Sequence, residues 1–147
     1  MYITPENRAF RTLKKISNFA SHMMGSMPNY ASEFPDDVVG RVFGVYENLP
    51  GTPNNYILLA DFGLVYILDG VQIRVDYTSI FGISYLPSPR TGLPPRQISL
   101  NCDNRVNVVL SVHGRSGKML DIHSFMRYLL RVCEDATGRM PHCFLEP

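Results

Sequence analysis

Two glycine turns, Phe62-Gly63 and Asp69-Gly70, divide residues 55–86 into three strand-like runs. An Asp-Gly pair between two such runs favours a tight β-hairpin, because the primed turns that connect antiparallel strands need residues at positive φ. The stretch therefore predicts consecutive antiparallel strands and a mainly β fold.

The first hairpin, residues 56–60 with 64–68, is apolar at nearly every position. The strand-like runs at 71–76, 97–102 and 105–113 instead alternate between apolar and polar residues, as antiparallel strands with one solvated face do. A hairpin without alternation needs cover on both faces, because a monomer rarely leaves such a patch open. We expect the N-terminal helix to cover the second face; a partner chain and self-association are the alternatives.

The N-terminal segment begins with strong helix signals: Thr4 as a cap, Pro5 at the first helical position and Glu6 in the first turn. We expect the helix to run to about Met24, with Gly25 as its left-handed stop. At 100° per residue, its apolar side would carry Leu13, Ile16, Ala20, Met23 and Met24. The other side would carry Arg8, Arg11, Lys15, Asn18 and His22, with Phe19 as an apolar exception. We expect this helix to pack on the rest of the domain; the alternative is a detachable arm that meets a membrane surface or a partner.

The length of 147 residues suits a single domain with its own core. We divide it into an N-terminal amphipathic helix (1–25), a connector (26–38), a β body with a closing helix (39–137) and a tail (138–147). Prolines and the Asp36-Asp37 pair interrupt the connector, so we expect it to cross the surface in an extended form.

The clearest helical pattern starts at Asp121, the expected cap, and ends at Gly138. Its apolar residues share one face: Ile122, Phe125, Met126, Leu129, Leu130, Val132 and Cys133. Such a face belongs in a hydrophobic core, so we expect this helix to close one end of the β body.

Seven predicted strands followed by one amphipathic helix is the element order of the pleckstrin-homology (PH) superfold. The segment Leu59-Ala60-Asp61-Phe62-Gly63-Leu64 resembles the turn between the second and third strands of GRAM and bacterial PH-like domains. The segment Tyr77-Thr78-Ser79-Ile80 resembles the step that follows in those domains. The resemblance covers about residues 39–134 and implies a bent antiparallel barrel of about seven strands, capped by the C-terminal helix.

PH domains that bind phosphoinositides use basic residues beside the loop between their first two strands. Here that loop is LPGTPNN (49–55), which has no basic residue, and Glu47 precedes it. The resemblance therefore implies a fold and not this mode of headgroup binding.

The formal net charge of +1 produces no overall field that would attract nucleic acid, so we expect no nucleic-acid partner. The sequence has no run of 18 apolar residues, and its N-terminus lacks the apolar core of a secretory signal. Its three cysteines have no recognisable spacing, and their odd number argues against a disulfide framework. We therefore expect a cytoplasmic protein without a transmembrane segment.

No group of residues has a spacing typical of catalysis. Residues 114–118, GRSGK, lack the first glycine and the hydroxyl residue of a phosphate loop. Cys133 lies on the apolar helix face and His123 does not, which argues against a shared metal. Cys102 should face the core and His113 the solvent, so they do not form a nucleophile and base pair. We expect no catalytic residues, metal or cofactor; the alternative is an enzyme with a pocket at the barrel mouth.

The leading hypothesis is a non-catalytic PH-like module that acts through a protein partner, for example as a small bacterial inhibitor or immunity protein. The candidate contact residues are Phe19, Tyr56, Tyr66, Arg90 and Arg96. The alternative is a module that binds a membrane (lipid) surface through the N-terminal helix. Its candidate residues are Arg8, Arg11 and Lys15, with Phe19 as an apolar wedge.

Overall fold

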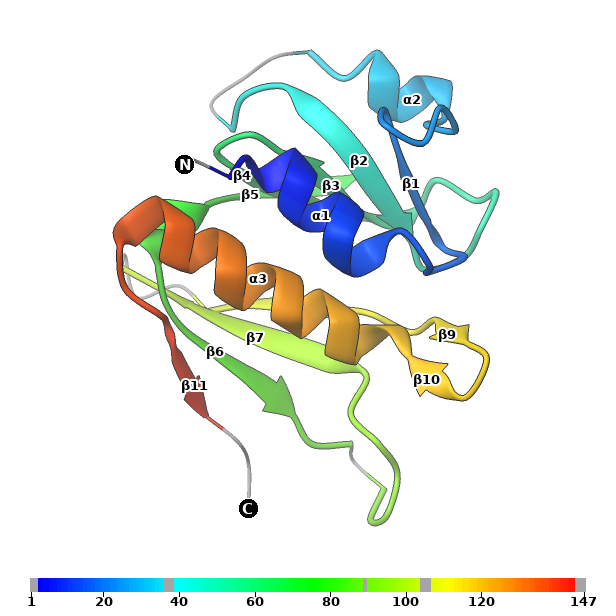
Figure 1. The fold of residues 1–147 in the computed structure, drawn as a ribbon. Helices are drawn as coiled ribbons and strands as arrows, with labels where there is room; N and C mark the ends of the chain where they lie inside the picture. The colour runs from blue at the N-terminus through cyan, green and yellow to red at the C-terminus, as the bar shows by residue number, and fades with distance from the viewer. Residues whose placement is uncertain (1–2, 36–38, 89, 104–106, 145–147) are drawn as a thin grey trace.

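A computed structural model of the protein describes residues 3–35, 39–88, 90–103 and 107–144. A five-stranded sheet has the order β1-β2-β3-β4-β5, and a four-stranded sheet has the order β11-β6-β7-β8 (Figure 1). The first sheet consists of β1 (Phe19–Ser21), β2 (Val42–Glu47), β3 (Asn55–Ala60), β4 (Gly63–Leu68) and β5 (Val71–Asp76). The second consists of β6 (Ile80–Leu86), β7 (Gln97–Cys102), β8 (Asn107–Ser111) and β11 (His142–Phe144). A short 3-10 helix, η1 (Tyr77–Ser79), joins the sheets, and a two-stranded hairpin, β9 (Arg115–Ser116) with β10 (Met119–Leu120), precedes the last helix.

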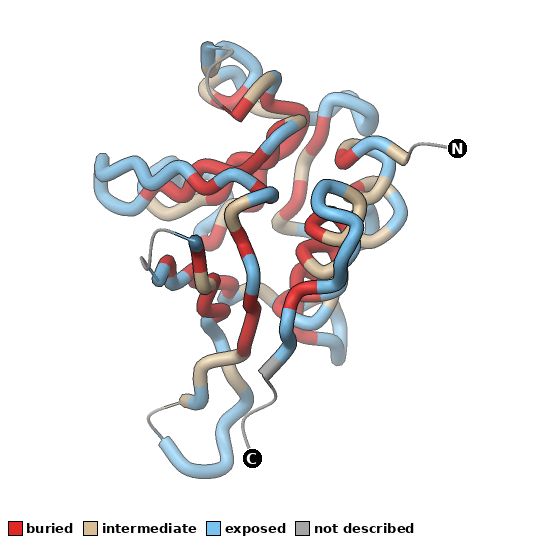
Figure 2. The backbone as a smooth tube through the Cα atoms, turned by 90° about the vertical axis from the view of Figure 1, so that its left-hand side faces the viewer, coloured by how far each residue is buried: buried red, intermediate tan, exposed pale blue. Residues whose placement is uncertain are grey.

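The predicted mainly β fold with a C-terminal helix is confirmed. The helix α3 (Asp121–Thr137) runs between the two sheets, with α1 (Pro5–Leu13) beside it (Figure 1). Buried side chains of both sheets and both helices form one hydrophobic core, and the buried stretches of strands and helices face the same interior (Figure 2).

The two sheets do not form a closed barrel, because no strand pairing among the described residues joins one sheet to the other. At one corner a side chain takes the place of strand pairing. The amide of Asn48, just after β2, donates to the Ser111 carbonyl at 2.7 Å and accepts from the His113 N–H at 2.7 Å. The structure thus supports two packed sheets with a C-terminal helix, which is coarser than the predicted barrel.

The prediction that the first helix continues to Met24 is wrong, because α1 ends at Leu13. Turns follow, in which the N–H of Ile16 donates to the Leu13 carbonyl and the N–H of Phe19 to the Ile16 carbonyl. Residues 19–21 then pair with β2 as the edge strand β1. Phe19, the apolar exception of the predicted helix, is only 3% exposed because it packs in the core as a strand residue. Strand pairing here overrides a helical pattern that local sequence favoured.

The second face of the β3–β4 hairpin is covered by the connector and not by α1, which corrects our expectation. The connector forms one turn of helix, α2 (Asn29–Ser32), in place of the extended crossover we predicted. Ala31 is fully buried in a second hydrophobic cluster together with Val39, Val42, Val45, Leu58, Ala60, Val65 and Ile67. Tyr30 and Phe34 pack against this cluster. The helix α1 packs on α3 in the main core instead.

Two further expectations need correction. We predicted that Val71, Ile73 and Val75 share an inward face, yet only Val75 is buried and Val71 is 61% exposed. The first half of β5 therefore extends beyond the core. The predicted tail contains a strand, since β11 pairs in parallel with β6.

The helix α3 follows the predicted pattern with one shift at its start. Asp121 is its first residue, with Leu120 at the N-cap position, and Gly138 ends it at φ 77° as predicted. Tyr128, which the apolar pattern left out, is fully buried, and its hydroxyl lies 2.6 Å from that of Tyr77. The sequence also predicts a tight turn at Asp103-Asn104 between two strands, and Asn104 lies outside the described residues.

Candidate functional site

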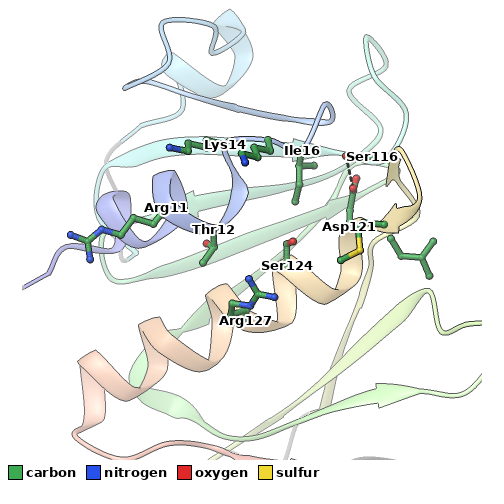
Figure 3. A pocket seen from close by; sticks show the side chains of 11 residues that line it. Arg11, Thr12, Lys14, Ile16, Ser116, Asp121, Ser124 and Arg127 are labelled. Atoms are coloured by element: carbon green, nitrogen blue, oxygen red, sulfur yellow. Dashed lines mark hydrogen bonds between the residues drawn. The ribbon is translucent and has the colours of Figure 1, made fainter.

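A basic hollow lies where the end of α1, the β9–β10 hairpin and the start of α3 meet (Figure 3). Its volume is about 500 Å³. The residues that line it are Arg11, Thr12, Lys14, Lys15, Ile16, Ser116, Met119, Leu120, Asp121, Ser124 and Arg127. We use the name basic hollow for this set, because four of its members are Lys or Arg and only one is acidic.

The core packing of α1 decides which of its side chains reach the hollow. Leu13 and Ile16 are buried, so the residues between and beside them remain at the surface. Lys14 and Lys15 are exposed just after α1 ends, and Arg11 is exposed in its last turn. These positions place three cations on one wall of the basic hollow.

The opposite wall is α3, which contributes Arg127 and the hydroxyl of Ser124. Figure 3 shows the Arg127 side chain rising from α3 towards α1, and the Thr12 hydroxyl on the facing helix. Arg8 belongs to the far end of the helix pair, where its guanidinium contacts Asp135 at 2.8 Å. The two helices therefore run antiparallel, with the Arg8–Asp135 ion pair at one end and the basic hollow at the other.

The β9–β10 hairpin forms the third wall and adds positive charge at the rim. Gly117 at φ 65° allows its tight turn. Arg115 and Lys118 on this hairpin are exposed, and Met119 is 59% exposed. With the four lining cations, six of the chain's 14 Lys and Arg residues lie in or beside the basic hollow.

Asp121, the one carboxylate in the lining, is buried and already hydrogen-bonded. Its Oδ2 accepts from the Tyr46 hydroxyl at 2.8 Å, and its Oδ1 accepts from the Ser116 hydroxyl at 2.8 Å. The Tyr46 oxygen in turn accepts from the Gly114 N–H at 2.9 Å. Burial, together with the hydrogen bond to Asp121, raises the pKa of Tyr46, so that its hydroxyl remains a neutral donor. This network forms the floor of the basic hollow and attaches the start of α3 to β2.

Of the membrane-binding candidates, the structure brings Arg11 and Lys15 together in the basic hollow and leaves Arg8 outside it. Of the partner-binding candidates, Phe19 and Tyr66 are each only 3% exposed and therefore lie away from any accessible surface. Phe19 is therefore neither a membrane wedge nor a partner contact, because its side chain packs in the core.

The other partner-binding candidates come from β3 and from the segment between β6 and β7. Tyr56 is half-buried, with its ring centroid 4.8 Å from that of Tyr30. Arg90 is exposed, and the Arg96 guanidinium donates to the His113 carbonyl at 2.7 Å.

Sequence reasoning missed Lys14, Ser124, Arg127 and Met119 as site residues. Lys14 precedes the other three residues by about 100 positions, and no motif links it to them. The one available signal was the group of basic residues near the end of the first helix.

The thiols and imidazoles considered for catalysis or metal binding differ in burial. Cys102 and Cys133 are buried, and burial raises the pKa of the Cys133 thiol to about 12. His113 is exposed, and the Nδ1 of His123 lies 3.1 Å from the Tyr85 hydroxyl. Within the part of the chain that the structure describes, no three His, Cys, Asp or Glu residues are grouped as metal ligands.

Comparison with models of protein families, with curated proteins and with solved structures found no match to this chain. Among the described residues, no helix combines the length and apolar character needed to cross a membrane.

Proposed function

We propose that this protein is a non-catalytic binding module of PH-like architecture and that the basic hollow receives a phosphate-bearing ligand. The seven strands β2 to β8 and the helix α3, which follows the β9–β10 hairpin, support the PH-like architecture. The presence of Arg11, Lys14, Lys15 and Arg127 in the lining of one hollow is the observation that carries the ligand.

The charge balance favours an anion with more than one negative charge. Clustered like charges repel one another, so four cations around one hollow are unfavourable without a counter-anion. Asp121 compensates only part of this charge, because it is one carboxylate among four Lys and Arg residues in the lining. A phosphate monoester carries about −1.5 to −2 charges at neutral pH, which matches several cations better than one carboxylate does.

The donors in the lining also suit phosphate oxygens. A guanidinium binds phosphate through two parallel N–H donors, and lysine ammonium groups act as point charges. Ser124 adds a hydroxyl on the α3 wall. The lining contains no thiol or imidazole, which supports binding rather than catalysis.

The experiment is isothermal titration of the protein with inorganic pyrophosphate, comparing Arg127→Ala with Arg131→Ala. Arg131 is a matched control, because it lies one turn further along α3, outside the hollow, and contacts Glu134 at 3.3 Å. A charge-assisted hydrogen bond contributes about 1.5–3 kcal/mol, so we expect Arg127→Ala to bind about tenfold more weakly or worse. Arg131→Ala should bind like the unmodified protein. Equal losses in both variants would show diffuse charge attraction and would refute the site.

A protein partner is the second candidate, favoured by one observation. Leu68, Val71 and Ile73 are exposed at the β4–β5 hairpin, and Leu68 pairs with Val71. Sedimentation equilibrium of the protein and of Val71→Ser tests self-association through this patch. A dimer that dissociates in the variant would favour this candidate, and a variant that binds a partner chain as tightly as the unmodified protein would reject the patch.

A further inference from the structure

We infer that this protein associates head to tail with copies of itself, and that the β9–β10 hairpin of one molecule binds in a pocket beside Phe62 of the next. The inference goes beyond the proposed function and does not depend on a ligand in the basic hollow. It rests on two surfaces of one chain that match in charge and apolar character and lie too far apart to meet within one molecule.

The first surface is a pocket at the end of the helix pair opposite to the basic hollow, with a volume of about 410 Å³. We call it the Phe62 pocket. Pro5 of α1 and Val132 of α3 are buried and form its apolar part. Phe62, in the turn between β3 and β4, adds an aromatic ring and is 66% exposed. A partner that covers this ring gains the free energy of removing a large apolar surface from water.

The exposed Phe62 ring is held in place by its surroundings. A Cβ at Gly40 would lie 2.8 Å from the ring carbon Cδ2, so the ring occupies the space that a side chain would fill. The Phe62 N–H donates to the Val39 carbonyl at 2.8 Å, and the Phe62 carbonyl accepts from the Tyr77 N–H at 3.0 Å. The ring is therefore positioned before a partner arrives, which reduces the entropy that binding costs.

The Phe62 pocket is lined by three carboxylates and by no Lys or Arg among the described residues. These carboxylates belong to Asp61, Asp76 and Asp135. Asp135 is paired with Arg8, whereas Asp61 shares Arg41 with Glu6. The Asp76 carboxylate is exposed and forms no ion pair or hydrogen bond within the part of the chain that the structure describes. Two arginines thus balance four carboxylates only in part, and negative charge remains for a cationic partner.

The second surface is the β9–β10 hairpin, which projects beyond the start of α3 (Figure 1). Its Arg115, Lys118 and Met119 are exposed, Met119 to 59%. Neither Arg115 nor Lys118 forms an ion pair with another described residue. Asp121 accepts from the Ser116 hydroxyl at the base of the hairpin, but it is only 1% exposed. The hairpin therefore presents an apolar side chain and two free cations to a second molecule.

The two surfaces complement each other. A thioether makes favourable contacts with an aromatic ring, so Met119 suits the exposed Phe62 ring. Arg115 and Lys118 suit the carboxylates of the pocket, among them the unpaired Asp76. A helix of 17 residues is about 25 Å long, so surfaces at its two ends do not meet within one molecule. A second copy supplies the missing partner, and a contact between unlike surfaces repeats from molecule to molecule.

The first test is a mixing experiment in the analytical ultracentrifuge. Phe62→Ala removes the pocket contact and keeps the hairpin, whereas Met119→Asp does the reverse. Both side chains are exposed, so we expect both variants to fold. The unmodified protein should form assemblies larger than a dimer as its concentration rises, and each variant alone should associate about tenfold more weakly or worse. An equal mixture should form a one-to-one complex that grows no further, because it contains one intact hairpin facing one intact pocket.

Leu93→Asp is the matched control for Met119→Asp, because Leu93 is 53% exposed and lines neither the Phe62 pocket nor the basic hollow. It should associate like the unmodified protein. A protein that stays monomeric at every concentration, or that stops at a dimer, would overturn the inference, and so would variants that do not associate when mixed. Association lost in Val71→Ser but kept in Phe62→Ala would assign self-association to the β4–β5 hairpin instead.

The second test distinguishes a second copy from another basic partner. Salt should weaken the association, because the charges of both surfaces are exposed and are screened. Association that is unchanged up to about 1 M salt would refute the charge complementarity. Binding of an oligolysine peptide by a protein that stays monomeric would assign the Phe62 pocket to a different basic partner and would overturn the inference.

Pyrophosphate titration separates this inference from the proposed function. Phe62→Ala should bind pyrophosphate as tightly as the unmodified protein, because Phe62 lies outside the basic hollow. Pyrophosphate binding by a protein that does not associate would overturn the inference and leave the proposed function standing. Association without pyrophosphate binding would support the inference and refute the proposed function.

Discussion

The hydroxyl of Tyr46 donates a hydrogen bond to the buried carboxylate of Asp121 at 2.8 Å, which joins β2 to the first residue of α3. The Gly114 N–H donates to the same hydroxyl at 2.9 Å. The Tyr46 hydroxyl thus links β2, the turn at Gly114 and the start of α3, and this network forms the floor of the basic hollow. The stability of the site can therefore be tested apart from its charge.

Tyr46→Phe should lower the free energy of unfolding by about 1–3 kcal/mol, because it leaves a buried carboxylate oxygen and the Gly114 N–H without a partner. Urea denaturation followed by circular dichroism measures this loss. Tyr85→Phe is the control, since the Tyr85 hydroxyl lies 3.1 Å from the ring of the exposed His123, and this substitution should cost less than about 1 kcal/mol. A loss no greater in Tyr46→Phe than in Tyr85→Phe would contradict the role of the network.

Gly114→Ala should destabilise the protein more than Gly117→Ala. A Cβ at Gly114 would overlap with the Asp121 carboxylate and the Tyr46 hydroxyl, whereas a Cβ at Gly117 meets nothing within 4 Å. Gly117→Ala should cost about 1 kcal/mol, because it places a side chain on a left-handed backbone. Gly114→Ala should cost roughly 1–3 kcal/mol, because the new Cβ overpacks the floor of the hollow. Thermal unfolding of both variants gives the comparison, and equal melting temperatures would argue that the floor of the hollow tolerates rearrangement.

Ala31→Glu should lower the free energy of unfolding by at least about 2 kcal/mol, because Ala31 is fully buried where α2 covers the β3–β4 hairpin. Ser32→Glu is the matched control, since Ser32 is exposed in the same turn of helix. We expect it to change stability by less than about 0.5 kcal/mol. Similar urea midpoints for the two variants would mean that α2 does not protect this face.

Arg127→Gln should raise the free energy of unfolding by up to about 0.5 kcal/mol at low salt, because it relieves repulsion among the cations of the basic hollow. Salt screens such repulsion, so the difference from the unmodified protein should vanish near 1 M salt. Pyrophosphate should raise the melting temperature of the unmodified protein and much less that of the variant. A variant that is less stable at low salt would show that Arg127 has a structural role instead.

The three thiols should differ in reactivity. Cys143 is exposed and should react rapidly with a disulfide reagent at pH 8, whereas the buried Cys102 and Cys133 should react only after unfolding. Cys143→Ser should abolish the rapid phase. A second fast thiol would contradict the burial of these two residues.

The raised pKa of the buried Cys133 thiol predicts that the free energy of unfolding falls at alkaline pH. Burial raises the pKa of Cys133 to about 12, while an unfolded thiol ionises near 9. Between these values the native state binds the extra proton, so the free energy of unfolding decreases as the pH rises above about 9. The raised pKa of Tyr77, caused mainly by burial, acts in the same direction. Urea denaturation at pH 8 and pH 10 tests the sign.

Elements with a local pattern were predicted well. The Asp69-Gly70 turn, the strands from β2 to β8 and the helix ending at Gly138 follow from turn chemistry and from the period of apolar residues. Errors arose where two structures compete locally. Residues 19–21 satisfy a helical pattern, yet pairing with Gly44–Tyr46 places the Phe19 ring in the core. The local sequence does not show whether the helix or the strand pairing has the lower free energy.

The candidate site was predicted only in part, and for the same reason. Arg11 and Lys15 were identified on one face of a segment, but their neighbours in space were not. Arg127 and Met119 join them only because α1 and α3 pack antiparallel and the β9–β10 hairpin turns beside both. A charged side chain alone does not reveal which other charges it will approach.

Local chemistry in this chain thus determined the strands, the turns and the last helix, because hydrogen-bonded turns and apolar periodicity act over a few residues. Tertiary packing decided that α2, and not α1, covers the second face of the β3–β4 hairpin, and that six cations gather around one hollow. Those outcomes depend on contacts between segments far apart in the chain, where the burial of apolar surface outweighs the mutual repulsion of the exposed charges.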